Sequence, residues 1–170
     1  MLDFDATVQF EHDPNGKQFH GVTLRRDDNT SWVVSYQPEP WLEPFADHRV
    51  HVTGEPYTPA GQALRRPHLR LHTLTLITTT QTLDGPLLIA IGREQTLRGS
   101  FTDKVGAPGT KLAGEPYRVF TVTGGDTYLL ANNPDGARPG QPQQIVAREV
   151  EYSPFVARRG GPTLWVLAIQ

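Results

Sequence analysis

The sequence contains no cysteine, only one methionine and only three lysines. Without cysteine the chain can form no disulfide, no thiolate metal site and no cysteine nucleophile. No segment approaches the about 18 apolar residues that a membrane-spanning helix needs. The first residues, 1–5, also lack the basic start and apolar stretch of a signal peptide. We therefore expect a soluble, cytoplasmic protein with no membrane partner.

An excess of one charge is also missing, because the formal net charge is −2 at pH 7. A near-neutral chain lacks the overall basic footprint that is typical of nucleic-acid-binding proteins, although a local patch remains compatible with it. Enzyme motifs are absent too: there is no nucleophile elbow, phosphate-binding loop, His-Glu-x-x-His run or dinucleotide fingerprint. We therefore expect no enzymatic activity and no cofactor.

Turn-forming residues, in contrast, are abundant, with 16 glycines and 15 prolines. The runs between them are rich in Thr, Val, Leu and aromatic residues, which suit a pleated and half-buried surface. No long amphipathic helix is apparent. The expected strands of the first half are 4–12, 19–25, 31–37, 49–53, 68–77 and 87–91. Those of the second half are 96–101, 117–122, 127–131, 145–152 and 164–169. The pattern predicts an all-β protein.

One expected strand, 68–77, has an alternation that slips. Leu69 and Leu71 share one face, whereas Leu74 and Leu76 share the other. We expect a β-bulge near Thr73, because one extra residue moves the following side chains to the opposite face.

The two halves of the chain resemble each other after a shift of about 95 positions. Tyr57–Pro59 corresponds to Tyr152–Pro154, since 152 − 57 = 95, and the same shift places Pro67 on Pro162. A pair of arginines lies between these landmarks in both halves. A repeat of this length indicates two copies of one structural unit.

Each copy is expected to contain a strand, a hairpin, a long loop, a strand, a loop and a final strand. Five short strands that close on themselves resemble the oligonucleotide/oligosaccharide-binding (OB) type of barrel. Gly54 is similar to the glycine common after the third strand of such barrels, although the second copy has Glu149 there. The resemblance implies two small OB-like barrels, residues 1–92 and 93–170, packed as a pseudo-symmetric pair. A double-sheet sandwich is the alternative architecture.

Candidate ligand-binding residues flank the last strand of each copy. Arginine holds phosphates bidentately and stacks on bases, and tyrosine offers a stacking surface. These candidates are Tyr57, Arg65, Arg66, Tyr152, Arg158 and Arg159. The alternative is that the arginines only protect an exposed strand edge from aggregation. Trp41, which lies between prolines, is expected to be exposed and to anchor a saccharide, a peptide or a protein.

Three histidines of the first copy are candidates for a metal site. His68 and His72 project from the same face of a regular strand, because side chains there repeat every two residues. If the strand that carries His51 lies beside them, three imidazoles could converge on zinc. The alternative is a polar, solvent-facing strand surface.

We expect a non-catalytic binding or assembly module that recognises a protein, a peptide or a saccharide through the loops of its barrels. Single-stranded nucleic-acid binding through the arginine-flanked faces is the first alternative. A metal-binding protein or a small metal-dependent enzyme is the second. Such barrels host unrelated functions, so the fold alone does not select among them, and the oligomeric state stays open.

Overall fold

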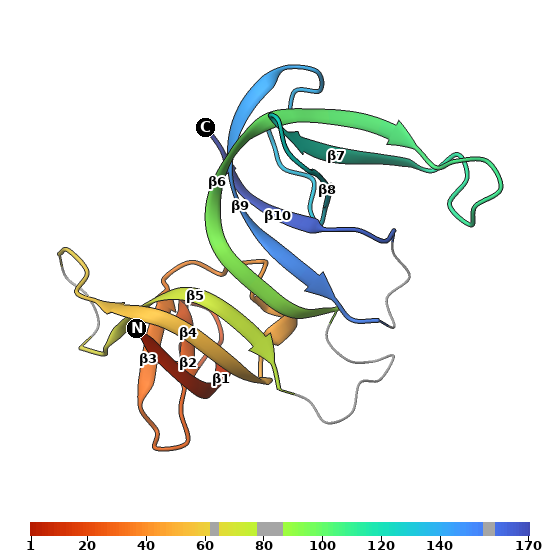
Figure 1. The fold of residues 1–170 in the computed structure, drawn as a ribbon. Coiled ribbons are helices and arrows are strands. Elements are labelled where there is room, and N and C mark those ends of the chain that lie inside the picture. The colour runs from red at the N-terminus through yellow and green to blue at the C-terminus, as the bar shows by residue number, and fades with distance from the viewer. Residues whose placement is uncertain (62–64, 78–86, 155–158) are drawn as a thin grey trace. The chain divides into compact units, whose positions relative to one another are not determined.

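The computed structural model describes residues 1–61, 65–77, 87–154 and 159–170. These ranges contain ten strands and one short 3-10 helix (Figure 1). The elements are β1 (Leu2–His12), β2 (Phe19–Arg25), β3 (Ser31–Ser35), η1 (Glu43–Phe45), β4 (Arg49–Tyr57), β5 (His68–Leu76), β6 (Leu88–Val105), β7 (Pro116–Val122), β8 (Thr127–Leu130), β9 (Pro142–Tyr152) and β10 (Thr163–Ile169). The predicted all-β class is confirmed. Among the described residues, no helix has the length and apolar character that crossing a membrane requires.

The strands form one hydrogen-bonded sheet in the order β3-β2-β1-β4-β5-β6-β7-β8-β10-β9, with additional β3–β5 and β6–β9 pairings. The alternative of two stacked sheets is therefore wrong. The chain divides into two compact units. Unit 1 comprises Met1–Arg93 with a short segment that starts at Tyr152, and unit 2 comprises Glu94–Glu151 with the segment that ends at Gln170.

The pairings of unit 1 close into a ring of five strands. β1 pairs antiparallel with β2 and β4, and these pair in turn with β3 and β5. The ring closes where Val33 of β3 pairs in parallel with His68 of β5. The Val33 amide donates to the carbonyl of Pro67 at 2.9 Å. Apolar side chains from every strand fill the interior, and η1 adds Phe45, which is fully buried.

The pairings of unit 2 close in the same strand order. β6 pairs with β7 and β9, and β8 pairs in parallel with β10 at Leu129 and Thr163. The Leu129 amide donates to the carbonyl of Pro162 at 2.9 Å. The core of this unit consists of Phe101, Phe120, Ile145, Ala147, Leu164 and Val166.

The bulge expected near Thr73 is confirmed. Thr73 pairs with Thr53, but the next pair along β4 is Gly54 with Leu71, so His72 is the extra residue. The bulge restores one inward face, and Leu69, Leu71 and Leu74 are all buried. A side chain at Gly54 would not fit beside the bulge, because an added Cβ would lie 2.6 Å from the carbonyl oxygen of Arg70.

Most predicted strands are confirmed to within a few residues, and two boundaries are wrong. β4 continues past Gly54 to Tyr57, because the bulged β5 offers it partners along this whole length. The predicted strands 87–91 and 96–101 are one strand, β6. Its polar middle carries little strand preference, but the stretches on either side pair with β5 and β7. Pairing therefore outweighs local propensity here.

Candidate functional site

The strand pairing that closes unit 1 brings several of the predicted residues together. His68, at 3% exposure, is buried beside two tyrosine rings, each with its centroid 5.7 Å away. One is Tyr36, whose Oη lies 2.5 Å from His68 Nε2, and the other is Tyr57. The guanidinium of Arg70 lies 5.5 Å from the centroid of the Tyr57 ring. Tyr57, Tyr36 and His68 therefore form a small aromatic cluster, and the exposed guanidinium of Arg70 lies over the Tyr57 ring.

The predicted convergence of three imidazoles is wrong. Nε2 of His68 is in hydrogen-bond contact with the Tyr36 hydroxyl. His72 is displaced by the bulge, and its Nε2 lies 3.8 Å from a carboxylate oxygen of Glu55. His51 lies between two aspartates on another part of the sheet. Within the described ranges, no group of three or more His, Asp or Glu side chains could hold a metal ion. The bulge breaks the two-residue repeat on which the metal prediction depended.

Arg66, one of the two arginines predicted as ligand-binding residues in unit 1, forms an ion pair within that unit. The Arg66 guanidinium lies 2.6 Å from the Glu11 carboxylate at the end of β1. Its neighbour Arg65 is exposed. This ion pair joins the loop before β5 to β1.

Arg159 plays a similar part in unit 2. Its guanidinium lies 3.9 Å from the centroid of the Tyr117 ring and donates to the carbonyls of Leu112 and Glu115. It therefore covers an aromatic face that would otherwise be open to a ligand. Tyr152 is half-buried at the end of β9, and Arg158 lies outside the described residues.

The expectation that Trp41 is exposed is wrong, because only 7% of its surface is accessible. Its indole nitrogen donates to Glu39 at 3.0 Å, and the hydroxyl of Ser35 donates to the other oxygen of the same carboxylate at 2.8 Å. A buried tryptophan needs a partner for its N–H group, and Glu39 provides one. Trp41 is thus part of the core.

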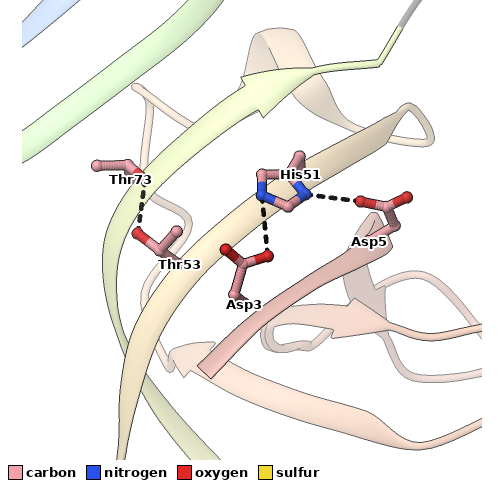
Figure 2. Close-up of polar contacts among 5 residues, drawn as sticks. All are labelled: Asp3, Asp5, His51, Thr53 and Thr73. Carbon is pink, nitrogen blue, oxygen red and sulfur yellow. Dashed lines mark hydrogen bonds and ion pairs between the residues drawn. The ribbon is translucent and has the colours of Figure 1, made fainter. Parts of the chain in front are cut away.

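A clamp of charged side chains joins β1 to β4 on an exposed face of unit 1 (Figure 2). His51 Nε2 lies 3.0 Å from Asp3, and His51 Nδ1 lies 2.8 Å from Asp5. Beside this clamp, the hydroxyls of Thr53 and Thr73 lie 2.6 Å apart. Each ring nitrogen of His51 therefore lies within hydrogen-bond distance of a carboxylate. These two contacts tie the side chain of β4 to two residues of β1.

Unit 2 contains an open cleft with a volume of about 500 Å³. Most of its lining side chains are polar, and no aspartate or glutamate side chain of the described ranges is among them. Hydrogen-bonding side chains come from β6, from the segment between β8 and β9, from β9 itself and from the residue after β10. They include Arg98, Arg138, Gln141, Gln143, Gln144 and Gln170.

A row of side-chain bonds crosses the floor of this cleft. Arg98 of β6 donates through Nε to the side-chain oxygen of Gln144 at 2.8 Å. The Gln144 amide donates in turn to the side-chain oxygen of Gln170, whose backbone amide bonds back to the Gln144 carbonyl. Gln144 thereby fixes the plane of the Arg98 guanidinium.

The segment between β8 and β9 forms one wall of the cleft, and it is tied down at several points. The side-chain oxygen of Gln143 accepts from the Arg138 amide at 2.7 Å, and its nitrogen donates to the carbonyl of Gly136 at 3.0 Å. Gly140 donates to the carbonyl of Phe101 in β6. Ala137 packs against the core. Arg138 is therefore presented on a fixed backbone.

The carboxyl groups with shifted pKa values lie elsewhere. The hydrogen bond from Arg49 lowers the pKa of Asp27, and the hydrogen bond from Arg118 lowers the pKa of Asp103. Burial raises the pKa of Tyr128, whose hydroxyl donates to Glu149. Each of these groups has a defined side-chain partner within its own unit, as structural ion pairs and hydrogen bonds do.

The sequence analysis missed the residues of the cleft. Three glutamines occur within residues 141–144, and this local density is the one signal that could have marked them. Arg98 and Gln170 join them only through strand pairing, which sequence spacing does not reveal. Compared with protein-family models, with curated proteins and with solved structures, the chain matches none.

Proposed function

We propose that this protein is a non-catalytic binding module and that the cleft of unit 2 holds its ligand, a saccharide. The observation that carries the proposal is a polar cleft of about 500 Å³ whose side chains are held by one another. Ligand sites are concave, and fixed polar groups in them give orientation and specificity. Because the groups are tethered before a ligand arrives, binding costs less conformational entropy.

The chemistry of the lining favours a saccharide over a peptide or a protein surface. Side-chain amides both donate and accept hydrogen bonds, and guanidinium groups donate them, so together they match neighbouring hydroxyls. No large apolar or aromatic side chain of the described ranges lines the cleft, so a peptide would find no pocket for an apolar anchor.

The absence of a catalytic role is part of the proposal. The exposed histidine of unit 1 that lies between carboxylates has both ring nitrogens bound to them. A general base must lie within hydrogen-bond reach of the proton that it removes, and here the two carboxylates already occupy both ring nitrogens. The cleft itself offers amides and guanidinium groups, which bind well but neither accept a proton nor attack a substrate at neutral pH.

We also infer that the two units are copies of an OB-type barrel. Around both rings the strands follow the same order: the first strand of the unit, then the second, third, fifth and fourth. In both rings the third and fifth strands pair in parallel. The closing bond supports the copy relation, because Val33 donates to Pro67 and Leu129 donates to Pro162, each at 2.9 Å. OB-type barrels bind oligosaccharides or oligonucleotides through their loops and one face.

The proposal is tested with an oligosaccharide array and purified protein. We expect binding to a subset of the saccharides, with slower amide hydrogen exchange over residues 136–144 when the ligand is present. The variant Gln143→Ala releases the wall of the cleft and should weaken binding about fivefold, since a lost hydrogen bond contributes about 1 kcal/mol. Lys104→Gln is the control, because Lys104 is exposed in unit 2 and does not line the cleft. Absence of saccharide binding would refute the proposal.

A second candidate is single-stranded nucleic-acid binding at the aromatic cluster of unit 1. Arg70 lies over the Tyr57 ring, and Tyr36 is 40% exposed beside it. Aromatic rings and cations on one surface are how such proteins hold bases and phosphates. Oligonucleotide binding that weakens with salt and is lost in Arg70→Gln would favour this candidate over the cleft.

A further inference from the structure

We propose that the saccharide recognised by unit 2 is anionic, and that Arg98 and Arg138 bind its acidic group. The inference rests on the proposed function, because it names the ligand class of the same cleft. It uses three observations: the orientation of Arg98, the exposure of Arg138, and the absence of aspartate and glutamate side chains from the lining described.

Arg98 is oriented and yet available. Its Nε bonds to Gln144, and its two Nη groups make no hydrogen bond or ion pair with the described residues. A guanidinium fixed by one edge presents its remaining donors in a rigid fork. That fork matches the two oxygens of a carboxylate or of a sulfate group.

Arg138 supplies the second cation. Its backbone is held by Gln143 and by the neighbouring Ala137 in the core, whereas its side chain is exposed and makes no bond with the described residues. The other arginines described in unit 2 differ in this respect. Arg118 pairs with Asp103, Arg148 lies 3.7 Å from Glu94, and Arg159 is bound to carbonyls.

The side chains of the lining carry positive charge only. Two guanidinium groups line the cleft, and no aspartate or glutamate side chain of the described ranges does so. Charges of one sign gathered in a concave site attract a ligand of the opposite sign. The surrounding glutamines then suit the hydroxyls of a sugar ring, so the acidic group and the ring are recognised by different parts of one site.

The lining also explains why charge matters for this ligand. Neutral sugars are usually bound with one ring face against an aromatic side chain, and none lines this cleft within the described ranges. Charge-assisted hydrogen bonds are about twice as strong as neutral ones, and they can replace that contribution. The uncharged form of the same sugar should therefore bind much more weakly.

The test uses matched pairs of oligosaccharides that carry a uronic acid, each presented as the free acid and as its neutral methyl ester. We expect the acid to bind the intact protein at least about tenfold more tightly than its ester, which corresponds to about 1.4 kcal/mol. Arg138→Gln should remove most of that preference, and Arg138→Lys should restore part of it. Lys104→Gln, an equal loss of charge away from the cleft, should keep it.

The outcomes separate the inference from the proposed function. If the methyl esters bind as tightly as the acids, the acidic ligand is refuted while a saccharide-binding cleft stands. If Lys104→Gln lowers the preference as much as Arg138→Gln does, overall charge is responsible and the assignment to the cleft is wrong. If neither acids nor esters nor neutral sugars bind, the inference fails together with the proposed function.

Discussion

At the scale of single residues, the ion pair between Asp27 and Arg49 should make stability depend on pH. The hydrogen bond from Arg49 is the largest cause that lowers the pKa of Asp27. A carboxyl group with a depressed pKa in the folded state stabilises the fold above its unfolded pKa of about 3.9 and loses this contribution as the pH falls through the folded value. We therefore expect Asp27→Asn to lower the melting temperature slightly at pH 7, with the difference disappearing in acid.

The measurement is a series of melting curves between neutral pH and about pH 2. The effect should be small, because both side chains are exposed and solvent screens the pair. Asp135→Asn is the control, since Asp135 is exposed and forms no ion pair among the described residues. A difference that grows as the pH falls would contradict the assigned sign.

Prediction of site residues from the sequence failed where burial or long-range pairing mattered. Trp41 lies among prolines that suggest exposure, but a hydrogen bond to Glu39 permits its burial. His51 meets Asp3 and Asp5 only because β1 pairs with β4 (Figure 2). The 46 positions between Asp5 and His51 carry no pattern that links them.

At the scale of strands, Gly54 should be essential to the bulged pairing of β4 with β5. An added Cβ would lie 2.6 Å from the carbonyl oxygen of Arg70 and 2.9 Å from the Leu69 side chain. Because a backbone carbonyl cannot rotate away, Gly54→Ala must shift the strands apart. We expect a loss of about 1–3 kcal/mol in the free energy of unfolding, measured with a chemical denaturant.

Gly160→Ala is the matched control, because an added Cβ there meets open space and its φ lies outside the left-handed region. It should change the stability by only a few tenths of a kcal/mol. Equal stability of the two variants would show that β4 and β5 accommodate the methyl group without strain.

Prediction from the sequence succeeded for a strand that carries its own signal. The slip in the alternation along β5 predicted the bulge. β6 was predicted as two strands because its middle, Arg93–Gln95, is polar. Only the partners on either side of that stretch make it part of one strand, and sequence patterns do not name partners.

At the scale of the whole molecule, Pro67 and Pro162, which the predicted correspondence pairs, each accept one backbone hydrogen bond at a parallel strand pairing. Each proline carbonyl accepts from the third strand of its own ring. The same shift of 95 pairs Leu69 with Leu164, and both are fully buried. The cleft of unit 2 was not predictable, because it depends on a segment between β8 and β9 that differs in sequence from the segment around η1.

Leu69 and Leu164 offer a matched test of whether the two units are stable independently. Each leucine is buried in the core of its own unit, so either change to alanine should destabilise that unit by about 2–5 kcal/mol. We expect Leu69→Ala to speed amide hydrogen exchange chiefly in β1 to β5, and Leu164→Ala to speed it chiefly in β7 to β10. Exchange measured segment by segment reports local opening energies. The strand β6 supplies residues to both units, so its amides should respond to both variants. If either variant instead lowers protection equally throughout the described chain, the units unfold as one and the cleft of unit 2 depends on the core of unit 1.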